Sequence, residues 1–136
     1  MNKNNQGVGL IEVLVTLLVI SIGMVGLSAL YLSGLQAAHS SYLRSLASAA
    51  ALDFEERTWI QAGTTDGCPD VETSVESMQV TWGSLLPSLE VLVVPVATTD
   101  RLWEGILTLT WSETRFGDTV DQFQYQFGVY CSEESS

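Results

Sequence analysis

The sequence predicts an α+β protein in which one long N-terminal helix packs on a roughly four-stranded antiparallel sheet. Three observations favour this fold class: an apolar stretch over residues 8–35, an amphipathic continuation of that stretch, and a second half of the chain in which apolar and polar residues alternate. The chain has 136 residues, which is enough for one modest globular domain beside the apolar stretch.

The apolar stretch contains a single charged side chain, Glu12. As a helix rising about 1.5 Å per residue it would be about 42 Å long, more than the roughly 30 Å hydrocarbon core of a bilayer. We therefore predict that residues 8–35 cross a membrane once. A buried core helix is disfavoured, because about 100 remaining residues could hardly surround so long an apolar cylinder. A secretory signal peptide fits poorly, because such signals have a shorter apolar core followed by a small-residue cleavage site.

The helix is predicted to continue past the apolar stretch, so that it spans about Val8–Gln61. Its second half carries apolar residues at helical spacing on one stripe, namely Leu43, Leu46, Ala47, Ala50 and Phe54. Asp53 and Arg57 have the spacing of an i,i+4 ion pair. Glycine, threonine and proline residues after Gln61 are stop and loop signals. We expect the second half of the helix to lie on a globular head made by residues 36–136.

Period-two patterns in the rest of the head predict four strands, at Val75–Trp82, Val91–Ala97, Trp103–Trp111 and Val120–Tyr130. In the last two strands large apolar residues share one face, and in the fourth strand glutamines occupy the other face. One apolar and one polar face are typical of an antiparallel sheet that packs on a helix with its apolar side. Pro95 predicts that the second strand is an edge strand or contains a bulge. Residues 114–119, with Gly117-Asp118 inside, are predicted to form a hairpin loop.

Charge and composition argue against a nucleic-acid partner. The formal net charge of the chain is −11, from 5 basic and 16 acidic residues. Without Lys3 and Glu12 the head has four arginines and fifteen acids, so it has the same net charge and repels phosphate. The strand aromatics could form a carbohydrate or nucleic-acid platform, but their alternation with polar residues favours core packing. These aromatics are Trp103, Trp111, Phe123, Tyr125 and Phe127. We interpret the acidity as a solubility feature rather than as a cation site.

No motif in the sequence predicts catalysis, a cofactor or a metal. The single histidine, His39, lies in no catalytic pattern, and the sequence contains no GxSxG, HExxH or glycine-rich phosphate loop. Asp66, Asp70 and Glu72 are too irregularly spaced for a calcium loop. We therefore expect a protein that works by binding other proteins and not an enzyme.

The residues MNKNNQG followed by VGLIEVLVTLLVISIG resemble the leader and helix start of type IV prepilins. In that family a short hydrophilic leader ends in glycine, and a dedicated inner-membrane prepilin peptidase removes it on the cytoplasmic side. The resemblance implies a leader over residues 1–7, cleavage between Gly7 and Val8, and N-methylation of Val8 by the same peptidase. It also implies the type IV pilin fold. Val8 departs from the phenylalanine that is commonest at this place, a change that the family tolerates.

The carboxylate of Glu12 has a physical explanation within this resemblance. An ionised side chain near the bilayer centre costs about 2.5–3.5 kcal/mol on insertion scales, so it persists where it has a partner or a task. Cleavage would create a cationic amine at Val8, one helical turn away. In the family the corresponding glutamate, five residues into the mature chain, pairs with the N-terminal amine of an adjacent subunit. Stabilisation of the first helical turn through the helix dipole is an alternative that can coexist.

Two glycines on one face of the apolar stretch, Gly23 and Gly26, leave three interpretations open. They can let a neighbouring helix approach closely. They can mark a stretch that loosens inside a filament, as in similar pilin helices. They can also be ordinary glycines of a membrane helix.

Further segments resemble the type IV pilus modification proteins, the PilV-like minor pilins: SIGMVGLSAL, SSYLRSLASAAALDFEER and LTLTWSE. This resemblance implies a minor type IV pilin that helps to initiate pilus assembly in a tip complex with other minor pilins, the major pilin and a tip adhesin. It implies an inner-membrane protein with a periplasmic head, later part of a Gram-negative pilus. A minor pseudopilin of a type II secretion system is the alternative. An ordinary single-span periplasmic protein is a third, and predicts no cleavage after Gly7.

The two cysteines, Cys68 and Cys131, lie outside the apolar stretch. A periplasmic head would let them form a disulfide. The bond would close a loop of about 64 residues, for which chain entropy gives about 4 kcal/mol of stabilisation. It would also tie the last strand to the loop after the helix. The alternative is that both cysteines are free, buried thiols. Many pilins have a C-terminal disulfide loop, although the pairing predicted here covers more of the head.

Overall fold

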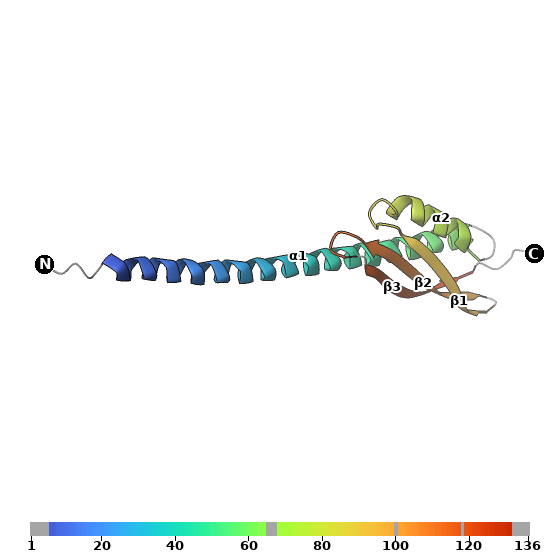
Figure 1. The fold of residues 1–136 in the computed structure, drawn as a ribbon. Coiled ribbons are helices and arrows are strands. Elements are labelled where there is room, and N and C mark those ends of the chain that lie inside the picture. Colours follow the sequence, from blue (N-terminus) through green and yellow to red (C-terminus); the bar gives the residue numbers. More distant parts are fainter. Residues whose placement is uncertain (1–5, 65–67, 100, 118, 132–136) are drawn as a thin grey trace, which may run out of the picture. The chain divides into compact units, whose positions relative to one another are not determined.

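The computed structural model describes residues 6–64, 68–99, 101–117 and 119–131. Its elements are, in order, α1 (Gln6–Thr64), α2 (Val71–Trp82), β1 (Glu90–Thr98), β2 (Leu102–Glu113) and β3 (Thr119–Tyr130) (Figure 1). The chain divides into two compact units, Met1–Ser40 and Ser41–Ser136. We call them the N-terminal helical unit and the head. Helix α1 contributes residues to both units, and the helix predicted over Val8–Gln61 is confirmed with a few residues added at each end.

In the N-terminal helical unit, every side chain described from Gly9 to Ala38 is exposed. Among the described residues, α1 is the one helix that is long and apolar enough to cross a membrane. Three hydroxyls in this unit bond to carbonyl oxygens one turn earlier: Thr16 to Glu12 at 2.6 Å, Ser21 to Leu17 at 2.7 Å and Ser28 to Met24 at 2.8 Å. These polar groups are therefore satisfied within the helix, as a lipid environment requires.

The sheet is antiparallel with the order β1-β2-β3. Leu107 in the central strand lies opposite Val93 of β1 and Tyr125 of β3. The strands predicted at Val91–Ala97, Trp103–Trp111 and Val120–Tyr130 are confirmed as β1, β2 and β3, each slightly longer than predicted. The effect of Pro95 is confirmed as well, because β1 is an edge strand and its register shifts between Pro95 and Ala97.

The predicted hairpin loop between the last two strands is also present. Strand β2 ends at Glu113 and β3 begins at Thr119. Gly117 has a φ of 141°, a backbone conformation that residues other than glycine rarely adopt. The neighbouring Asp118 lies outside the described residues.

The first of the four predicted strands, Val75–Trp82, is wrong, because this segment is helical and belongs to α2. In the described part of the chain the sheet therefore has three strands instead of four. The alternation of Met78, Val80 and Trp82 favoured a strand in the sequence, but Val80 is 85% exposed in the structure. The buried or half-buried apolar residues of the segment follow helical spacing instead: Val71, Val75, Met78 and Trp82.

Asp70 gives the physical reason why α2 forms. It is the N-cap residue, and its carboxylate accepts hydrogen bonds from the Glu72 backbone N–H at 3.1 Å and the Thr73 hydroxyl at 2.6 Å. An N-cap aspartate satisfies backbone donors that the first helical turn leaves unpaired. The hydrogen bond from Thr73, aided by the backbone donors, holds the pKa of Asp70 below its usual value.

The head's core lies between α1, α2 and the inner face of the sheet (Figure 1). The predicted stripe on α1 is confirmed, because Ala47, Ala50 and Phe54 are fully buried. The rings of Phe54 and Phe127 meet edge to face with centroids 5.2 Å apart, a favoured aromatic geometry. From the sheet, Leu107, Leu109, Trp111, Phe127 and Val129 are buried. The strand aromatics thus contribute mainly to the core, as predicted.

Polar bonds tie α1 to its neighbours around this core. The predicted pair of Asp53 and Arg57 is present, with Nε at 3.0 Å from Oδ2. The same carboxylate oxygen accepts a hydrogen bond from the Trp82 indole of α2 at 2.9 Å, and the Tyr125 hydroxyl of β3 donates to Glu55. Partial burial opposes ionisation of Asp53, but the bonds from Trp82 and Arg57 together lower its pKa. The bond to Glu55, together with burial, raises the pKa of Tyr125.

Candidate functional site

The candidate site for processing and assembly lies at the start of α1. Gly7 and Val8 are already helical, while residues 1–5 of the predicted leader lie outside the described residues. The Glu12 side chain is exposed on this helix, one turn after Val8. Within the described part of the chain no residue forms a hydrogen bond or ion pair with the Glu12 carboxylate. The monomer thus leaves this acid available for a group from outside the chain.

Small residues share the helix face of Glu12. Gly9, Thr16 and Gly23 follow one another at intervals of seven residues, which is close to two helical turns, and Glu12 falls between the first two. A Cβ atom added to Gly9, Gly23 or Gly26 would meet no atom within 4 Å apart from the adjoining residues and backbone of its own helix. Packing within the chain therefore does not require glycine at these positions. The face offers a close approach to a neighbouring helix, on the side where the carboxylate lies.

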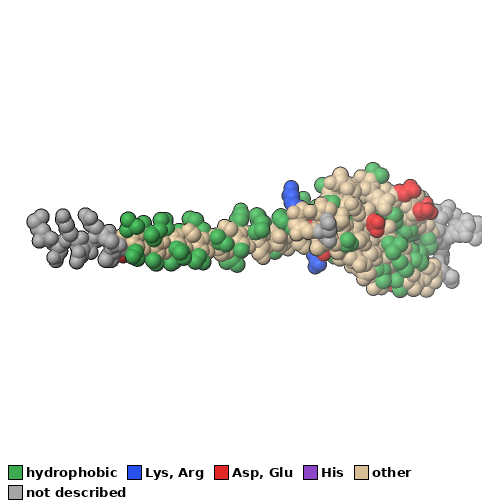
Figure 2. All heavy atoms as spheres, in the orientation of Figure 1, with side chains coloured by type: hydrophobic (Ala, Val, Ile, Leu, Met, Phe, Trp, Pro, Cys, Tyr) green, Lys and Arg blue, Asp and Glu red, His purple; other side chains and the backbone are tan. Residues whose placement is uncertain are grey.

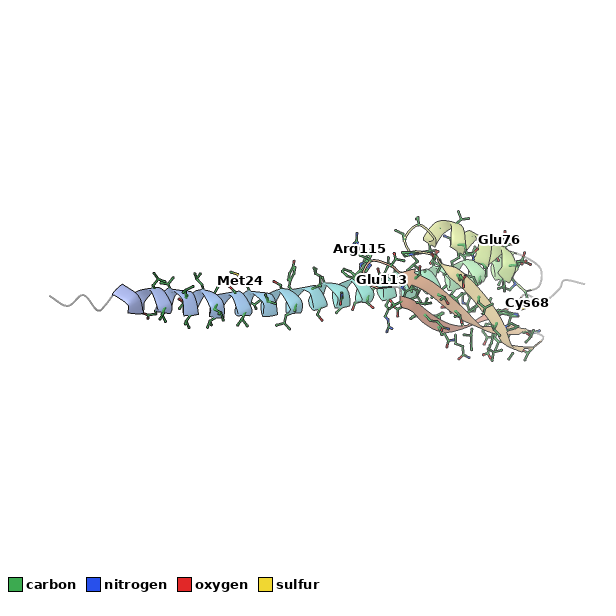
Figure 3. All side chains as sticks on the ribbon, viewed as in Figure 1. Met24, Cys68, Glu76, Glu113 and Arg115 are labelled. Atoms are coloured by element: carbon green, nitrogen blue, oxygen red, sulfur yellow. A yellow bond between two sulfur atoms is a disulfide. The ribbon has the colours of Figure 1, made fainter. Side chains whose placement is uncertain are left out.

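The rest of the apolar unit presents bulky side chains. Figure 3 shows side chains projecting around the N-terminal part of α1, with Met24 labelled among them. Leucine, isoleucine and valine side chains from Leu10 to Leu32 are between about half and three quarters exposed. Such a surface is suited to lipid tails or to other apolar helices, and it contrasts with the single carboxylate at Glu12.

The disulfide predicted between Cys68 and Cys131 is present, with the two Cα atoms 4.4 Å apart. It joins the segment that follows α1 to the residue that follows β3. The Cys131 backbone N–H also donates to the Arg101 carbonyl at 2.9 Å. The end of β3 is therefore fixed twice, and the alternative of free thiols is excluded.

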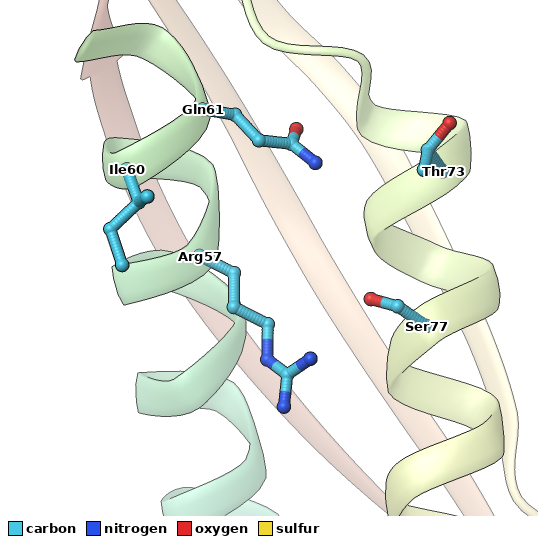
Figure 4. Close-up of a pocket in the computed structure, with 5 residues that line it drawn as sticks. All are labelled: Arg57, Ile60, Gln61, Thr73 and Ser77. Carbon is cyan, nitrogen blue, oxygen red and sulfur yellow. The ribbon is translucent and has the colours of Figure 1, made fainter. Parts of the chain in front are cut away.

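A groove of about 290 Å³ lies between α1 and α2 in the head. It is lined by Arg57, Ile60 and Gln61 of α1 and by Thr73 and Ser77 of α2, as Figure 4 shows. The guanidinium of Arg57 is already bound to Asp53, and no histidine, cysteine or carboxylate is among these lining residues. No group of three metal-ligating side chains occurs in the described parts of the chain. The groove thus offers neither proton-transfer chemistry nor a metal site.

Sequence reasoning missed the contacts that α2 makes, since it assigned this segment to a strand. The signal was nevertheless in the sequence, because Asp70 follows Pro69 and precedes Glu72 and Thr73, a typical helix start. Of the acids considered for a calcium loop, Asp70 is the helix cap. Asp66 lies outside the described residues.

Comparison with family models finds the prokaryotic N-terminal methylation motif over residues 2–28. Comparisons with curated proteins and with solved structures give no match. The motif, the long N-terminal helix and the antiparallel sheet together make this a type IV pilin-like protein, a structural and non-enzymatic class. The motif also indicates processing by a prepilin peptidase, insertion in the inner membrane, and assembly with other pilin-like subunits into a pilus or pseudopilus.

Proposed function

We propose that this type IV pilin-like protein is a PilV-like minor pilin that helps to initiate assembly of a type IV pilus. It acts in a tip complex with other minor pilins, the major pilin and a tip adhesin. Residues 1–7 are the leader, cleavage falls between Gly7 and Val8, and Val8 is N-methylated. Residues 8–35 span the inner membrane before assembly, and residues 36–136 form the periplasmic head.

The observation that carries this proposal is the exposed carboxylate of Glu12 in an otherwise apolar helix. The chain itself provides no partner among its described residues, and two small residues, Gly9 and Thr16, lie on the same face. Cleavage before Val8 places a new amine at the depth of this acid in every subunit. Helices that pack side by side then gain an ion pair between chains, which also fixes their relative height.

The charge of the head supports a minor subunit over the repeating subunit of a fibre. With a formal net charge of −11, identical heads stacked against each other would repel at each contact. A single copy placed among subunits of other charge avoids this repulsion. The oxidised cysteine pair fits a head that folds in the periplasm.

Mass spectrometry of the mature protein, isolated from its host, tests the proposal. The expected mass corresponds to a chain that starts at Val8 with one N-methyl group. The intact segment Met1–Gly7 in assembled material would contradict it. The pilus and secretion alternatives are separated by a deletion strain, which should lose surface pili and retain type II secretion. Loss of secretion with normal pili would make the protein a minor pseudopilin.

A further inference from the structure

Strand β1 has an apolar outer face that the rest of the head does not cover. Leu92 and Val94 lie opposite Thr108 and Ile106 of β2, and they are 59% and 47% exposed. Val96, at the register shift, is 53% exposed. We call Leu92, Val94, Val96 and the half-buried Ile106 the β1 patch. In Figure 2, hydrophobic side chains gather over this part of the head.

The opposite edge of the same sheet shows what a solvent-facing strand looks like in this protein. Along its middle, the outer face of β3 carries Gln122, Gln124 and Gln126, all exposed, and the apolar exposed residues of this face, Val120 and Tyr130, stand at its two ends. Antiparallel strands with one wet face normally place polar residues there, as β3 does. Strand β1 does the reverse along Leu92–Val96 and is also a sheet edge. Among the described residues β2 is its single neighbouring strand, so its second row of N–H and C=O groups faces no strand of this part of the chain. Apolar side chains beside an unpaired edge favour the addition of a strand.

The charges around the β1 patch select its occupant. Glu90 stands at one end of β1 and is exposed, and Glu104 lies opposite Ala97 at the other end. Acidic side chains also lie over the neighbouring helix α2 in Figure 2, where Glu72 and Glu76 are exposed. A second copy of this chain would bring the same acids to the interface and would be repelled. The complementary partner carries basic residues on both sides of a short apolar segment.

Pro95 limits how much of β1 can pair. It has no N–H to donate, and the register shift that follows it twists the edge away. Both features protect an edge against unrestricted pairing. The segment that remains regular is Glu90–Val94, so the added strand is about five residues long.

We propose that β1 is a docking edge for another polypeptide, which adds an extended segment with alternating apolar residues flanked by lysine or arginine. The backbone groups of Glu90–Val94 bind the segment, the β1 patch receives its apolar side chains, and Glu90 and Glu104 pair with its basic flanks. This inference does not depend on the proposed function, because docking at this edge requires neither leader cleavage nor a pilus.

Binding of a model strand to the full-length protein in neutral detergent micelles tests the proposal. The probe is the peptide KKVTVTVKK, and the matched control is EEVTVTVEE. The lysine peptide should bind at least about tenfold more tightly than the glutamate peptide. It should also slow amide hydrogen exchange in β1 without changing exchange in β3. Equal binding of the two peptides, or protection confined to β3, would overturn the proposal.

Two variants with the same change of charge separate the β1 patch from general electrostatic attraction. Val94→Lys should weaken binding of the lysine peptide at least about tenfold, whereas Gln124→Lys on the outer face of β3 should leave it nearly unchanged. Both sites are exposed, so both variants should fold, which their circular dichroism checks. Similar effects of the two variants would refute the role of the β1 patch. A dimer in sedimentation equilibrium that Val94→Lys dissociates would make a second copy the occupant instead.

Discussion

The part of α1 in the N-terminal helical unit and the part in the head differ in what surrounds them. Every side chain described from Gly9 to Ala38 is exposed, whereas Ala47, Ala50 and Phe54 are fully buried. A helix gains little stability from its own hydrogen bonds in water and usually depends on packing of an apolar face. The first part therefore needs lipid or other helices, while the head supplies packing for the second. The two parts can accordingly be perturbed separately.

The largest effect on assembly is expected from Glu12→Leu, which acts on the first part alone. The variant should insert in the membrane at least as well as the wild type, because a buried charge costs about 2.5–3.5 kcal/mol on insertion scales. In the wild type, an ion pair between Glu12 and the amine of a neighbouring chain would offset that cost. Loss of this ion pair should weaken association between the subunits about hundredfold. Co-purification with partner pilin-like subunits measures this loss. Val13→Leu, in the same turn, is the control, and unchanged co-purification of Glu12→Leu would refute a pairing role.

Phe54→Ala is expected to act on the head alone. The side chain is fully buried and packs edge to face on Phe127, so its removal should lower the free energy of unfolding by about 3–5 kcal/mol. Urea unfolding followed by near-ultraviolet circular dichroism measures the change. Leu52→Ala, at a position that is 55% exposed on the same helix, should cost less than about 1 kcal/mol. Equal losses in the two variants would show that the burial contrast along α1 does not govern stability.

Removing the disulfide by Cys68→Ser with Cys131→Ser should lower the free energy of unfolding by about 2–4 kcal/mol. The end of β3 loses its tie to the segment after α1, so amides near Tyr130 should exchange faster than those in the middle of the strand. A reductant should reproduce the loss in the wild type and change nothing in the double variant. Insertion of the helix in membranes should stay the same, because the disulfide lies in the head. A wild type insensitive to reductant would contradict this expectation.

The sequence predicted those elements whose residue pattern has one period throughout. The apolar stretch, the alanine-rich stripe ending at Phe54, and the alternation in β2 and β3 all led to the correct element and face. Pro95 predicted the edge strand because a missing N–H has the same consequence in any fold. The disulfide followed from the presence of two cysteines outside the apolar stretch.

Prediction from the sequence failed where a segment fits both the strand period and the helix period, or where the structure depends on contacts between distant segments. Met78 and Trp82 fit an alternation with Val80 and also fit a helical spacing with Val71 and Val75, and the cap by Asp70 decides between the two patterns. In β1, nearly every residue from Val91 to Val96 is apolar, so the pattern predicts a strand but not which face stays exposed. That choice depends on the register with β2. The candidate site was found from a local motif, since leader, helix start and Glu12 are consecutive in the chain, whereas the β1 patch required the sheet.

The smallest expected effect concerns Asp53, which lies in the part of α1 that belongs to the head. Its carboxylate is hydrogen-bonded to α2. Its carboxylate accepts bonds from Trp82 and Arg57, and its pKa in the folded head is lowered. A lowered pKa means that the ionised form stabilises the fold at pH values above the ordinary pKa of about 4. This contribution is lost as the pH falls from about 4 through the folded pKa.

Asp53→Asn should therefore cost about 0.5–1 kcal/mol at neutral pH, since both members of the ion pair are partly exposed. The asparagine can still accept from the Trp82 indole, but it has no charge for Arg57. Stability measured by urea unfolding should consequently fall less steeply below pH 4 in the variant than in the wild type. Glu56→Gln, at an exposed position on the same helix, removes the same charge and is the control. Equal pH slopes for wild type and Asp53→Asn would show that the charge of this carboxylate does not help to hold α1 to α2.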